Sequence, residues 1–316
     1  MVLKKVAVSI GDINGVGIQL ALENHSKVKK LCNPIYCIDK KLLVKAVKRL
    51  SLNIPKDFTY YGKYKKCEIN PSEVRKDSGR FSYDSFKVAI NLAKQRKVDA
   101  ITTLPVNKES WSRAGIDYVG HTDMLRDVFK KDAIMMLGCD KMFVALYTEH
   151  IPLKDVPKNI KVKKLISFLL DFYDSIGRPN EHIAILGLNP HAGDNGVLGD
   201  EEEKIKKAIK KVNSYLAKTF NLQSSTFTLQ VPDIAFTPHV REQFKYFVAM
   251  YHDQGLAPLK ALYFEESINV SLNLPIIRTS VDHGTAFDIS YKKENNLSSK
   301  SYINAVKKAV ELAEKV

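Results

Sequence analysis

The sequence predicts an α/β fold in which a largely parallel sheet carries helices on both faces. Short apolar runs alternate along the chain with amphipathic stretches, an order typical of strands joined by helical crossovers. The 316 residues are enough for one large domain or for two lobes that share a sheet. In such folds ligands bind beyond the carboxyl ends of the strands, so functional residues are sought there.

The apolar runs predict strands of ordinary length, and the longer stretches with apolar residues at helical spacing predict helices. Strands are expected at residues 5–10, 34–38, 100–104, 133–137, 142–147, 182–188, 247–251 and 268–272. Helices are expected at residues 40–50, 83–96, 160–175, 201–216 and 302–315.

Two glycine-rich loops follow predicted strands. Residues 11–17 lack the G-x-G-x-x-G spacing and the Lys-Ser/Thr pair of a P-loop, so we expect a plain strand-to-helix turn there. Residues 187–196 combine Gly, Asn, Pro and His after a strongly apolar strand. Glycines in such a loop allow the backbone to approach a ligand closely, which makes this second loop a candidate binding element.

The formal net charge of +14 indicates either a nucleic-acid binder or a lysine-rich surface. We favour the second interpretation, because the lysines are scattered and no aromatic residues alternate with them as stacking platforms. A basic field would also attract phosphorylated substrates and dinucleotides. We therefore expect no nucleic-acid partner.

The N-terminal apolar run is too short for a signal peptide, and no apolar stretch approaches the length of a membrane span. The four cysteines form no C-x-x-C pair. We expect a soluble, cytoplasmic protein with no membrane partner, whose cysteines are reduced and mostly buried.

Three histidines share one sequence context, because His150, His191 and His252 each lie just past an apolar strand. Three neutral imidazoles can hold a divalent ion and leave positions open for substrate oxygens, which defines a catalytic metal site. No local ligand spacing links the three residues, so three unrelated loop histidines remain the alternative.

Residue types that bind anions surround these histidines in the sequence. The segment 120–123 precedes an amphipathic stretch, so it is either a helix N-terminus that binds an anion or a plain N-cap formed by Thr122 or Asp123. Lys260 lies eight positions after His252. Arg278 is flanked by apolar residues, so its guanidinium is either part of a structural ion pair or a bidentate clamp on an anion.

Two further polar residues have open interpretations. Asn269 is either an ordinary polar residue of an edge strand or a substrate contact. Asp233 either caps a turn after Pro232 or serves as an acid–base group.

Six motifs occur in one order over nearly the whole chain. They are Pro105-Val106-Asn107-Lys108, Gly120-His121-Thr122-Asp123, His150-Ile151-Pro152-Leu153, Leu188-Asn189-Pro190-His191-Ala192-Gly193, Met250-Tyr251-His252-Asp253-Gln254-Gly255-Leu256 and Arg278-Thr279-Ser280-Val281-Asp282-His283-Gly284-Thr285-Ala286. Together they resemble the 4-hydroxythreonine-4-phosphate dehydrogenase family of vitamin B6 synthesis.

The resemblance implies a two-lobed α/β/α sandwich similar to isocitrate and isopropylmalate dehydrogenases, and not a Rossmann domain. It implies one catalytic unit over residues 1–316, with tentative lobes at 1–120 plus 253–316 and at 121–252. Family members are homodimers with the metal at the subunit interface, so we expect an active site shared between two chains.

The activity that the resemblance implies is oxidation of 4-phosphooxy-L-threonine at its 3-hydroxyl with NAD or NADP. The product, 2-amino-3-oxo-4-phosphooxybutanoate, then loses CO2 to give 3-amino-2-oxopropyl phosphate. One divalent ion per site is expected, and zinc, magnesium, cobalt and manganese all remain open.

The resemblance also implies roles for single residues. Metal ligands would be His150, His191 and His252. Substrate would be bound by His121, Thr122, Lys260, Asn269 and Arg278, with Lys260 or Asp233 as the catalytic base. Cofactor contacts would come from Asn189, Gly193, Asp282, Gly284, Thr285 and Asp288.

The chain departs from the family pattern at Ile13 and Asn14 in the first glycine-rich loop and at residues 290–293 after Asp288. The second departure leaves the choice between NAD and NADP open. A dehydrogenase of a four-carbon sugar-acid phosphate, such as erythronate or threonate 4-phosphate, is the alternative within the same class. A metal-dependent hydrolase of a phosphorylated small molecule is a more distant one.

Overall fold

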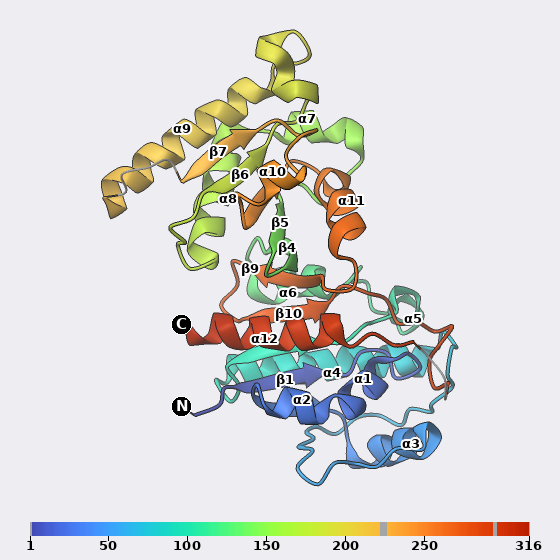
Figure 1. Cartoon of the computed structure of the whole chain (residues 1–316). Helices are drawn as coiled ribbons and strands as arrows, with labels where there is room; N and C mark the ends of the chain where they lie inside the picture. Colours follow the sequence, from blue (N-terminus) through green and yellow to red (C-terminus); the bar gives the residue numbers. More distant parts are fainter. Residues whose placement is uncertain (1, 222–225, 293–295, 316) are drawn as a thin grey trace. The chain divides into compact units, whose positions relative to one another are not determined.

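The computed structural model describes residues 2–221, 226–292 and 296–315. The chain forms two compact units (Figure 1). Unit 1 comprises Met1–Ala133 and Ile268–Val316, and unit 2 comprises Ile134–Ser267. We expected the lobes to divide near residues 120 and 253, and the units divide after Ala133 and after Ser267.

Unit 1 contains five neighbouring strands in the order β2-β1-β3-β10-β9. Both parallel and antiparallel pairings occur among them. The central strands are parallel, and β9 is antiparallel to β10. This mixed order differs from the all-parallel sheet of a Rossmann domain. The strands are β1 (Lys5–Ser9), β2 (Asn33–Cys37), β3 (Ala100–Thr103), β9 (Ile268–Leu272) and β10 (Arg278–Val281). The helices are α1 (Gly17–Glu23), α2 (His25–Lys29), α3 (Lys40–Leu50), α4 (Lys76–Lys94), α5 (Lys108–Arg113), α6 (His121–Phe129) and α12 (Lys300–Glu314).

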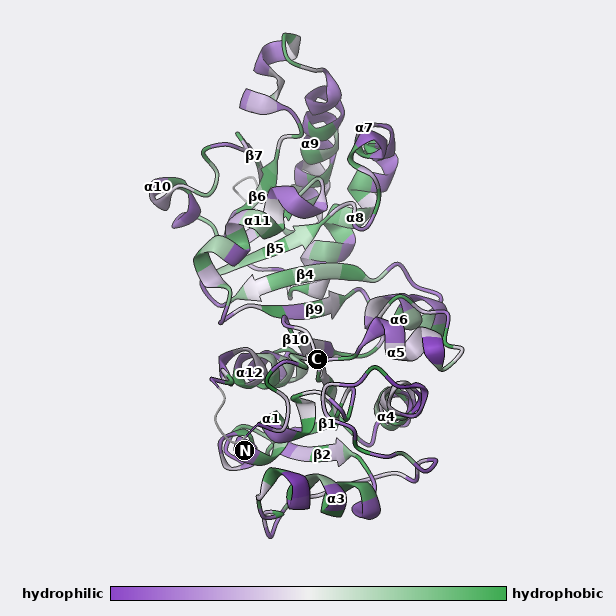
Figure 2. Cartoon of the chain, turned by 90° about the vertical axis from the view of Figure 1, so that its right-hand side faces the viewer, coloured by the Kyte–Doolittle hydropathy of each residue, from purple (hydrophilic) through white to green (hydrophobic). Residues whose placement is uncertain are grey.

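Helices cover both faces of the unit 1 strands, as the sequence predicted (Figure 2). Alternation along β1 sends Val6 and Val8 into one hydrophobic cluster and Ala7 into another. The first cluster includes Tyr302 of α12, and the second includes Phe86 of α4. Both faces of this sheet are therefore buried, which accounts for the continuous apolar runs in the sequence.

Unit 2 has the strand order β4-β5-β8-β6-β7, with β4 antiparallel to β5 and the remaining neighbours parallel. Its strands are β4 (Ile134–Cys139), β5 (Met142–Leu146), β6 (Ile183–Leu186), β7 (Phe227–Gln230) and β8 (Tyr246–Ala249). Its helices are η1 (Leu153–Asp155), α7 (Val156–Asn159), α8 (Val162–Ser175), η2 (Pro190–Gly196), α9 (Glu201–Phe220), α10 (Pro238–Arg241) and α11 (His252–Tyr263).

Helices also pack on both faces of the unit 2 strands. Leu256 and Leu259 of α11 belong to a cluster with Phe247 of β8. On α8, Phe172 contacts the ring of Tyr246. The α/β/α organisation expected from the sequence is confirmed in each unit.

Most predicted elements are present, and α3 matches its predicted bounds. The prediction for α4 is wrong at its start, which lies at Lys76 and not at residue 83. Its first turns carry polar residues and Gly79, but a Cβ at Gly79 would lie 2.0 Å from the Ser110 carbonyl oxygen. Close packing against α5 thus accounts for Gly79 in these turns. Together with the polar residues it interrupts the apolar periodicity from which a helix is predicted.

Two further observations concern the cysteines and the apolar character of the helices. The four cysteines are free and buried, as predicted. None of the helices in the described part of the chain combines the length and the apolar character needed to cross a lipid bilayer.

Candidate functional site

The three candidate metal ligands follow three neighbouring parallel strands of unit 2. His150 comes after β5, His252 after β8 and His191 after β6, and β8 pairs with both β5 and β6. Because the carboxyl ends of parallel strands meet at one edge of a sheet, the fold brings these three segments to the same edge. The sequence predicted this common position.

Hydrogen bonds beyond the strands tie the three segments together. The backbone N–H of Thr148 donates to the Met250 carbonyl at 3.2 Å, which extends the pairing of β5 with β8 toward His150. Gln254, in the first turn of α11, accepts from the Met250 N–H at 2.7 Å and donates to the Gly187 carbonyl at 2.6 Å. Gln254 therefore links the start of α11 to the end of β6, a role that the sequence did not indicate.

The rings of His150 and His252 lie together, with centroids 5.6 Å apart. His252 Nδ1 lies 2.7 Å from Asp253 Oδ1, and His191 Nδ1 lies 3.7 Å from Asp233 Oδ2. A carboxylate beside a ring nitrogen orients an imidazole for metal binding through its other nitrogen. The residue types and the strand ends thus fit a divalent ion.

Within the described residues of this single chain, no group of three or more His, Cys, Asp or Glu side chains is gathered closely enough to hold a metal. His150 and His252 form one pair, while His191 pairs with Asp233. Asp233 therefore lies beside a candidate metal ligand, although its role as a base stays a prediction.

The loop that carries His191 has an unusual backbone. His191, Ala192, Gly193, Asp194 and Asn195 all have positive φ angles, between 42° and 79°. L-residues rarely adopt this left-handed region, so the surrounding structure must hold the loop in place. The glycine-rich character of residues 187–196 accounts for only part of this conformation, because most of the left-handed residues carry a side chain.

In unit 1, Arg278 begins β10 and is only 2% exposed. Its guanidinium donates from Nη1 to Ser271 Oγ at 3.1 Å and from Nη2 to Thr103 Oγ1 at 2.7 Å, while Nε has no partner in the described structure. Burial lowers the pKa of this guanidinium to about 9. No described carboxylate pairs with Arg278, which favours the anion clamp over the structural ion pair.

His121 is the first residue of α6, whose N-cap is Gly120. No side chain caps this helix, so the plain N-cap interpretation of Thr122 or Asp123 is wrong. The His121 ring packs edge-on against Phe86 and Trp111. Burial, aided by the nearby charge of Arg278, holds the His121 pKa well below its ordinary value. A neutral, buried imidazole and open backbone N–H groups therefore lie near the buried guanidinium.

Asn269 shares a sheet face with Arg278. In the antiparallel pairing Asn269 opposes Ser280, and Arg278 opposes Ser271, so the four side chains project from the same side. The Asn269 side-chain oxygen is buried and has no hydrogen-bond partner among the described residues. His121 Nε2 and Arg278 Nε are likewise buried and have no hydrogen-bond partner among the described residues. Three unpartnered polar atoms near one another indicate a place for a polar ligand.

Two further predicted substrate residues have different surroundings. Thr122 is buried in the first turn of α6, next to His121. Lys260 lies in α11 of unit 2, about 12 Å along the helix axis from His252 at the usual rise per residue. Its ammonium group lies 5.4 Å from the centre of the Phe264 ring.

The predicted cofactor residues fall into two groups. In unit 2, the Asn189 side chain donates to Glu201 at 2.8 Å and to Glu202 at 2.9 Å, and Gly193 lies against Glu202. Both residues thus have structural partners. In unit 1, Asp282, Gly284, Thr285 and Asp288 follow β10, and nothing would meet a Cβ within 4 Å at Gly284. Open space beside a glycine fits the close approach of a ligand to the backbone.

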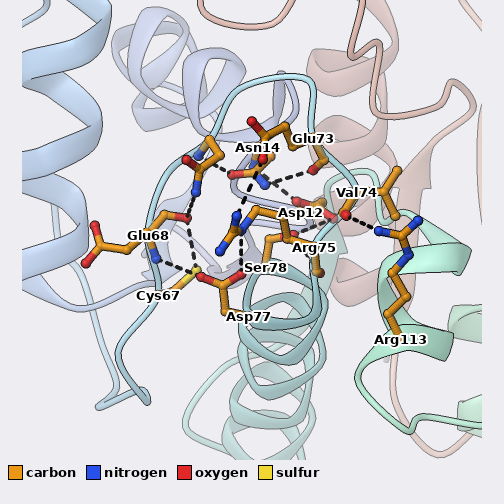
Figure 3. A network of polar contacts seen from close by, with 11 residues as sticks. Asp12, Asn14, Cys67, Glu68, Glu73, Val74, Arg75, Asp77, Ser78 and Arg113 are labelled. Carbon is orange, nitrogen blue, oxygen red and sulfur yellow. Dashed lines mark hydrogen bonds and ion pairs between the residues drawn. The ribbon is translucent and has the colours of Figure 1, made fainter.

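The first glycine-rich loop is the expected strand-to-helix turn, and polar contacts hold it (Figure 3). Asp12 accepts from the Asn14 N–H at 3.0 Å and from Ser78 Oγ at 3.2 Å, and burial raises the Asp12 pKa. Asn14 donates to the Glu73 carbonyl at 2.9 Å. The two departures from the family pattern meet here, because Tyr291 Oη donates to the Ile13 carbonyl at 2.8 Å. Of the second departure, Lys293 lies outside the described residues.

A cavity of about 790 Å³ lies beside this network in unit 1. Its charged walls pair with one another, as in Arg75 with Asp77 and Arg80 with Asp84. None of the predicted site residues lines it. The cavity is therefore separate from the predicted site residues.

The sequence missed several residues that support the site. Gln254 and Glu202 hold the loops of unit 2, and Ser271 and Thr103 accept from Arg278. Gln254 lies inside a motif that the sequence singled out, which was a usable signal. The others have no local pattern, because their partners are distant in the sequence.

The fold is that of an α/β enzyme with histidines at its strand ends and a buried guanidinium, and solved dehydrogenases share the architecture. The chain is similar to the crystal structure of a 4-hydroxythreonine-4-phosphate dehydrogenase from Burkholderia phymatum, with 29% identity, a TM-score of 0.78 and 99% of each chain covered. A structure of that enzyme from Klebsiella pneumoniae matches with 29% identity and a TM-score of 0.78 over 98% of each chain.

The family itself is shown by sequence. The model of the family "Pyridoxal phosphate biosynthetic protein PdxA" matches residues 30–309, so the chain belongs to this family. It is 59% identical to the 4-hydroxythreonine-4-phosphate dehydrogenase of Sulfurimonas denitrificans over 99% of both chains. It is 52% identical to that of Campylobacter fetus over 99% of this chain and 100% of the relative.

Proposed function

We propose that this protein oxidises 4-phosphooxy-L-threonine with NAD or NADP, in the synthesis of pyridoxal 5'-phosphate. Membership of the PdxA family supports the pathway, and the names of the relatives supply the substrate. The buried, carboxylate-free Arg278 is the structural observation that carries the proposal. It calls for an anionic ligand, and the substrate has a phosphate and a carboxylate.

In unit 1 the proposed roles concern substrate binding. Arg278 binds one anionic end through the guanidinium edge that includes Nε. The first turn of α6, with His121 and Thr122, donates hydrogen bonds to an anion from the backbone and from the Thr122 hydroxyl. The neutral His121 ring adds one donor or acceptor, and the Asn269 side-chain oxygen accepts from a substrate donor such as the ammonium group.

In unit 2 the proposed roles concern the reacting hydroxyl. His150, His191 and His252 are the residues that would hold a divalent ion, and Asp253 orients the His252 ring. When bound, such an ion lowers the pKa of the substrate hydroxyl and stabilises negative charge on its oxygen. Lys260 or Asp233 accepts the hydroxyl proton.

The reaction balances in two steps. The 3-hydroxyl loses a proton to a base, and the hydrogen on the same carbon leaves as hydride to the oxidised nicotinamide. The substrate is oxidised to the 3-oxo acid, and NAD or NADP is reduced. The carboxylate is then lost as CO2, and a proton replaces it to give 3-amino-2-oxopropyl phosphate.

The cofactor and assembly are part of the same proposal. The segment from Asp282 to Asp288, with its open glycine, contacts the dinucleotide. The protein acts as a homodimer with a shared site, which is supported by the separation of the histidines into two groups within one chain. Four buried free thiols support a reducing, cytoplasmic location.

A substrate panel with spectroscopic detection of the reduced nicotinamide tests this function. We expect turnover of 4-phosphooxy-L-threonine with NAD or NADP, accompanied by release of CO2. Faster turnover of erythronate or threonate 4-phosphate would instead assign the sugar-acid alternative. Release of inorganic phosphate with no change in the nicotinamide would assign the hydrolase.

A further inference from the structure

We propose that Glu202, a residue outside the predicted site, is a positioning residue that fixes the loop carrying His191. The proposal deepens the proposed function and rests on it in one respect, namely that His191 binds the metal. The effect of Glu202 on the hydrogen exchange of the loop can be measured without any metal.

The Glu202 carboxylate is only 2% exposed and is surrounded by donors from that loop. Its Oε1 accepts from the backbone N–H groups of Leu188 and Asn189, each at 2.7 Å. Its Oε2 accepts from the Asn189 side-chain amide at 2.9 Å. These two donor residues stand immediately before Pro190 and His191. Glu202 therefore anchors the start of the loop, at Leu188 and Asn189.

Glu202 also contacts the middle of the loop. A Cβ added at Gly193 would lie 2.6 Å from Glu202 Oε2, so the backbone there passes directly over the carboxylate. The residues from His191 to Asn195 all have the left-handed conformation that L-residues rarely adopt. A run of this kind persists only where its surroundings hold it.

A carboxylate suits this position for a chemical reason. Three N–H donors converge on two oxygens, and an ionised carboxylate is an acceptor only. A glutamine at the same place would keep one accepting oxygen for the two backbone groups. Its own NH2 group would then face the Asn189 amide, donor against donor. No lysine or arginine pairs with Glu202 in the described part of the chain, so its contacts belong to the loop.

The start of the loop is also held by a residue of a second helix. Gln254 donates to the Gly187 carbonyl at 2.6 Å, and Gln254 belongs to the first turn of α11, which His252 begins. The loop is thus held between α9, through Glu202, and α11, through Gln254. Releasing the α9 side frees His191 while leaving His252 in place.

The experiment compares Glu202→Gln and Glu202→Ala with Glu203→Gln. Glu203 lies in the same helical turn, is exposed and pairs with Lys206, so its substitution is a matched control. Hydrogen exchange of residues 187–197 is measured in the metal-free proteins. Binding of Co²⁺ alone is measured by titration, with the absorption spectrum of the bound ion as a second readout.

We expect faster exchange of the loop in both Glu202 variants and Co²⁺ binding weaker by about tenfold or more, as is usual when support for a ligand is lost. Glu202→Ala should show the larger effect, and Glu203→Gln should match the wild type. If Glu202→Ala does not fold, the test relies on Glu202→Gln, because this variant keeps the side-chain volume.

Unchanged exchange in the Glu202 variants would overturn the proposal. Faster exchange with unchanged Co²⁺ affinity and spectrum would overturn it as well, because the loop would then not set the position of His191. A wild-type protein that binds no metal and reduces no nicotinamide would refute the proposed function. The exchange data would still decide whether Glu202 holds the loop.

Discussion

At the scale of single residues, Arg278 lies in an environment that calls for a ligand. A guanidinium removed from water loses hydration, and two hydroxyl acceptors replace only part of it. A carboxylate partner would compensate, yet none pairs with it in the described structure. The anionic substrate of the proposed reaction would supply the missing charge.

The first prediction concerns Arg278. Arg278→Lys should raise the KM for the phosphorylated substrate about tenfold or more, because a point charge cannot reproduce a bidentate fork and a charge-assisted hydrogen bond contributes about 1.5–3 kcal/mol. Arg278→Met should abolish substrate binding without lowering the Tm of the free protein, since no buried partner charge is left behind. Steady-state kinetics and thermal unfolding measure the two effects. Arg113→Lys, at an exposed arginine, is the control.

A large fall in Tm for Arg278→Met with an unchanged KM for Arg278→Lys would show that the residue is structural. The sequence left this choice open, because a flanking apolar pattern predicts burial but does not show which groups lie around the side chain. The three-dimensional contacts favour the anion clamp, and the two variants test it.

The second prediction concerns His121 and acid stability. Burial holds its folded pKa well below the ordinary value of 6.5, so below about pH 6.5 the unfolded chain takes up a proton that the folded chain does not. Stability is therefore lost as the pH falls through this window, by up to about 1.4 kcal/mol per pH unit. Urea unfolding at several pH values should show a shallower slope in His121→Gln than in the wild type.

His239 is exposed and provides the matched control, because His239→Gln should leave the slope unchanged. Equal slopes in the wild type and His121→Gln would mean that His121 titrates normally in the folded protein.

At the scale of elements, the buried strands and the long amphipathic helices could be predicted from the sequence. Their apolar periodicity reflects burial directly, as in β1 and α3. The strand β10 was missed because it carries Arg278, Thr279 and Ser280 at buried positions. Thr279 donates to the Ala305 carbonyl of α12, a partner that only the tertiary fold provides.

The loop at residues 187–196 shows the same limit. Its glycines, Pro190 and His191 indicate a binding loop, but they do not predict a run of left-handed residues or the acidic residue that holds it. The candidate histidines could be predicted because a residue just past a strand has a known place in a parallel sheet. The supporting Glu202 could not, because it comes from α9 and belongs to none of the motifs that the sequence singled out.

The third prediction tests the packing of this loop. Gly193 and Gly196 both have positive φ angles, of 79° and 97°, but only Gly193 has an atom within 4 Å of an added Cβ. Gly193→Ala should therefore cost the strain of a left-handed residue, about 1–2 kcal/mol, plus the displacement of Glu202 and of the Gly199 carbonyl. Gly196→Ala should cost the strain alone. Urea unfolding compares the two variants, and equal losses of stability would show that these neighbours yield without cost.

At the scale of the whole molecule, the candidate residues divide between the two compact units. The proposed anion-binding residues Arg278, His121 and Asn269 lie in unit 1, and the proposed metal ligands His150, His191 and His252 lie in unit 2. Within one chain these three ligands do not form a metal-holding group among the described residues. In the proposed dimer, a second copy of the chain would supply the missing ligand.

The fourth prediction concerns this sharing. His191→Ala and His252→Ala proteins, each inactive alone, are unfolded and refolded together. If the two ligands of one site come from opposite chains, mixed dimers place both lesions in one site and leave the other intact. Random pairing makes about half of the dimers mixed, so roughly a quarter of wild-type activity should return. No recovery of activity would show that His191 and His252 of one site come from the same chain.

Metal-assisted oxidation is tested most directly by the rate of nicotinamide reduction on 4-phosphooxy-L-threonine before and after chelation. The protein is treated with a chelator, freed of it, and assayed with NAD and NADP, first alone and then with zinc, magnesium, cobalt or manganese. We expect the rate to fall to background on chelation and to return with at least one of these ions. A rigorously metal-free preparation that keeps its full rate would contradict a role for His150, His191 and His252 as metal ligands.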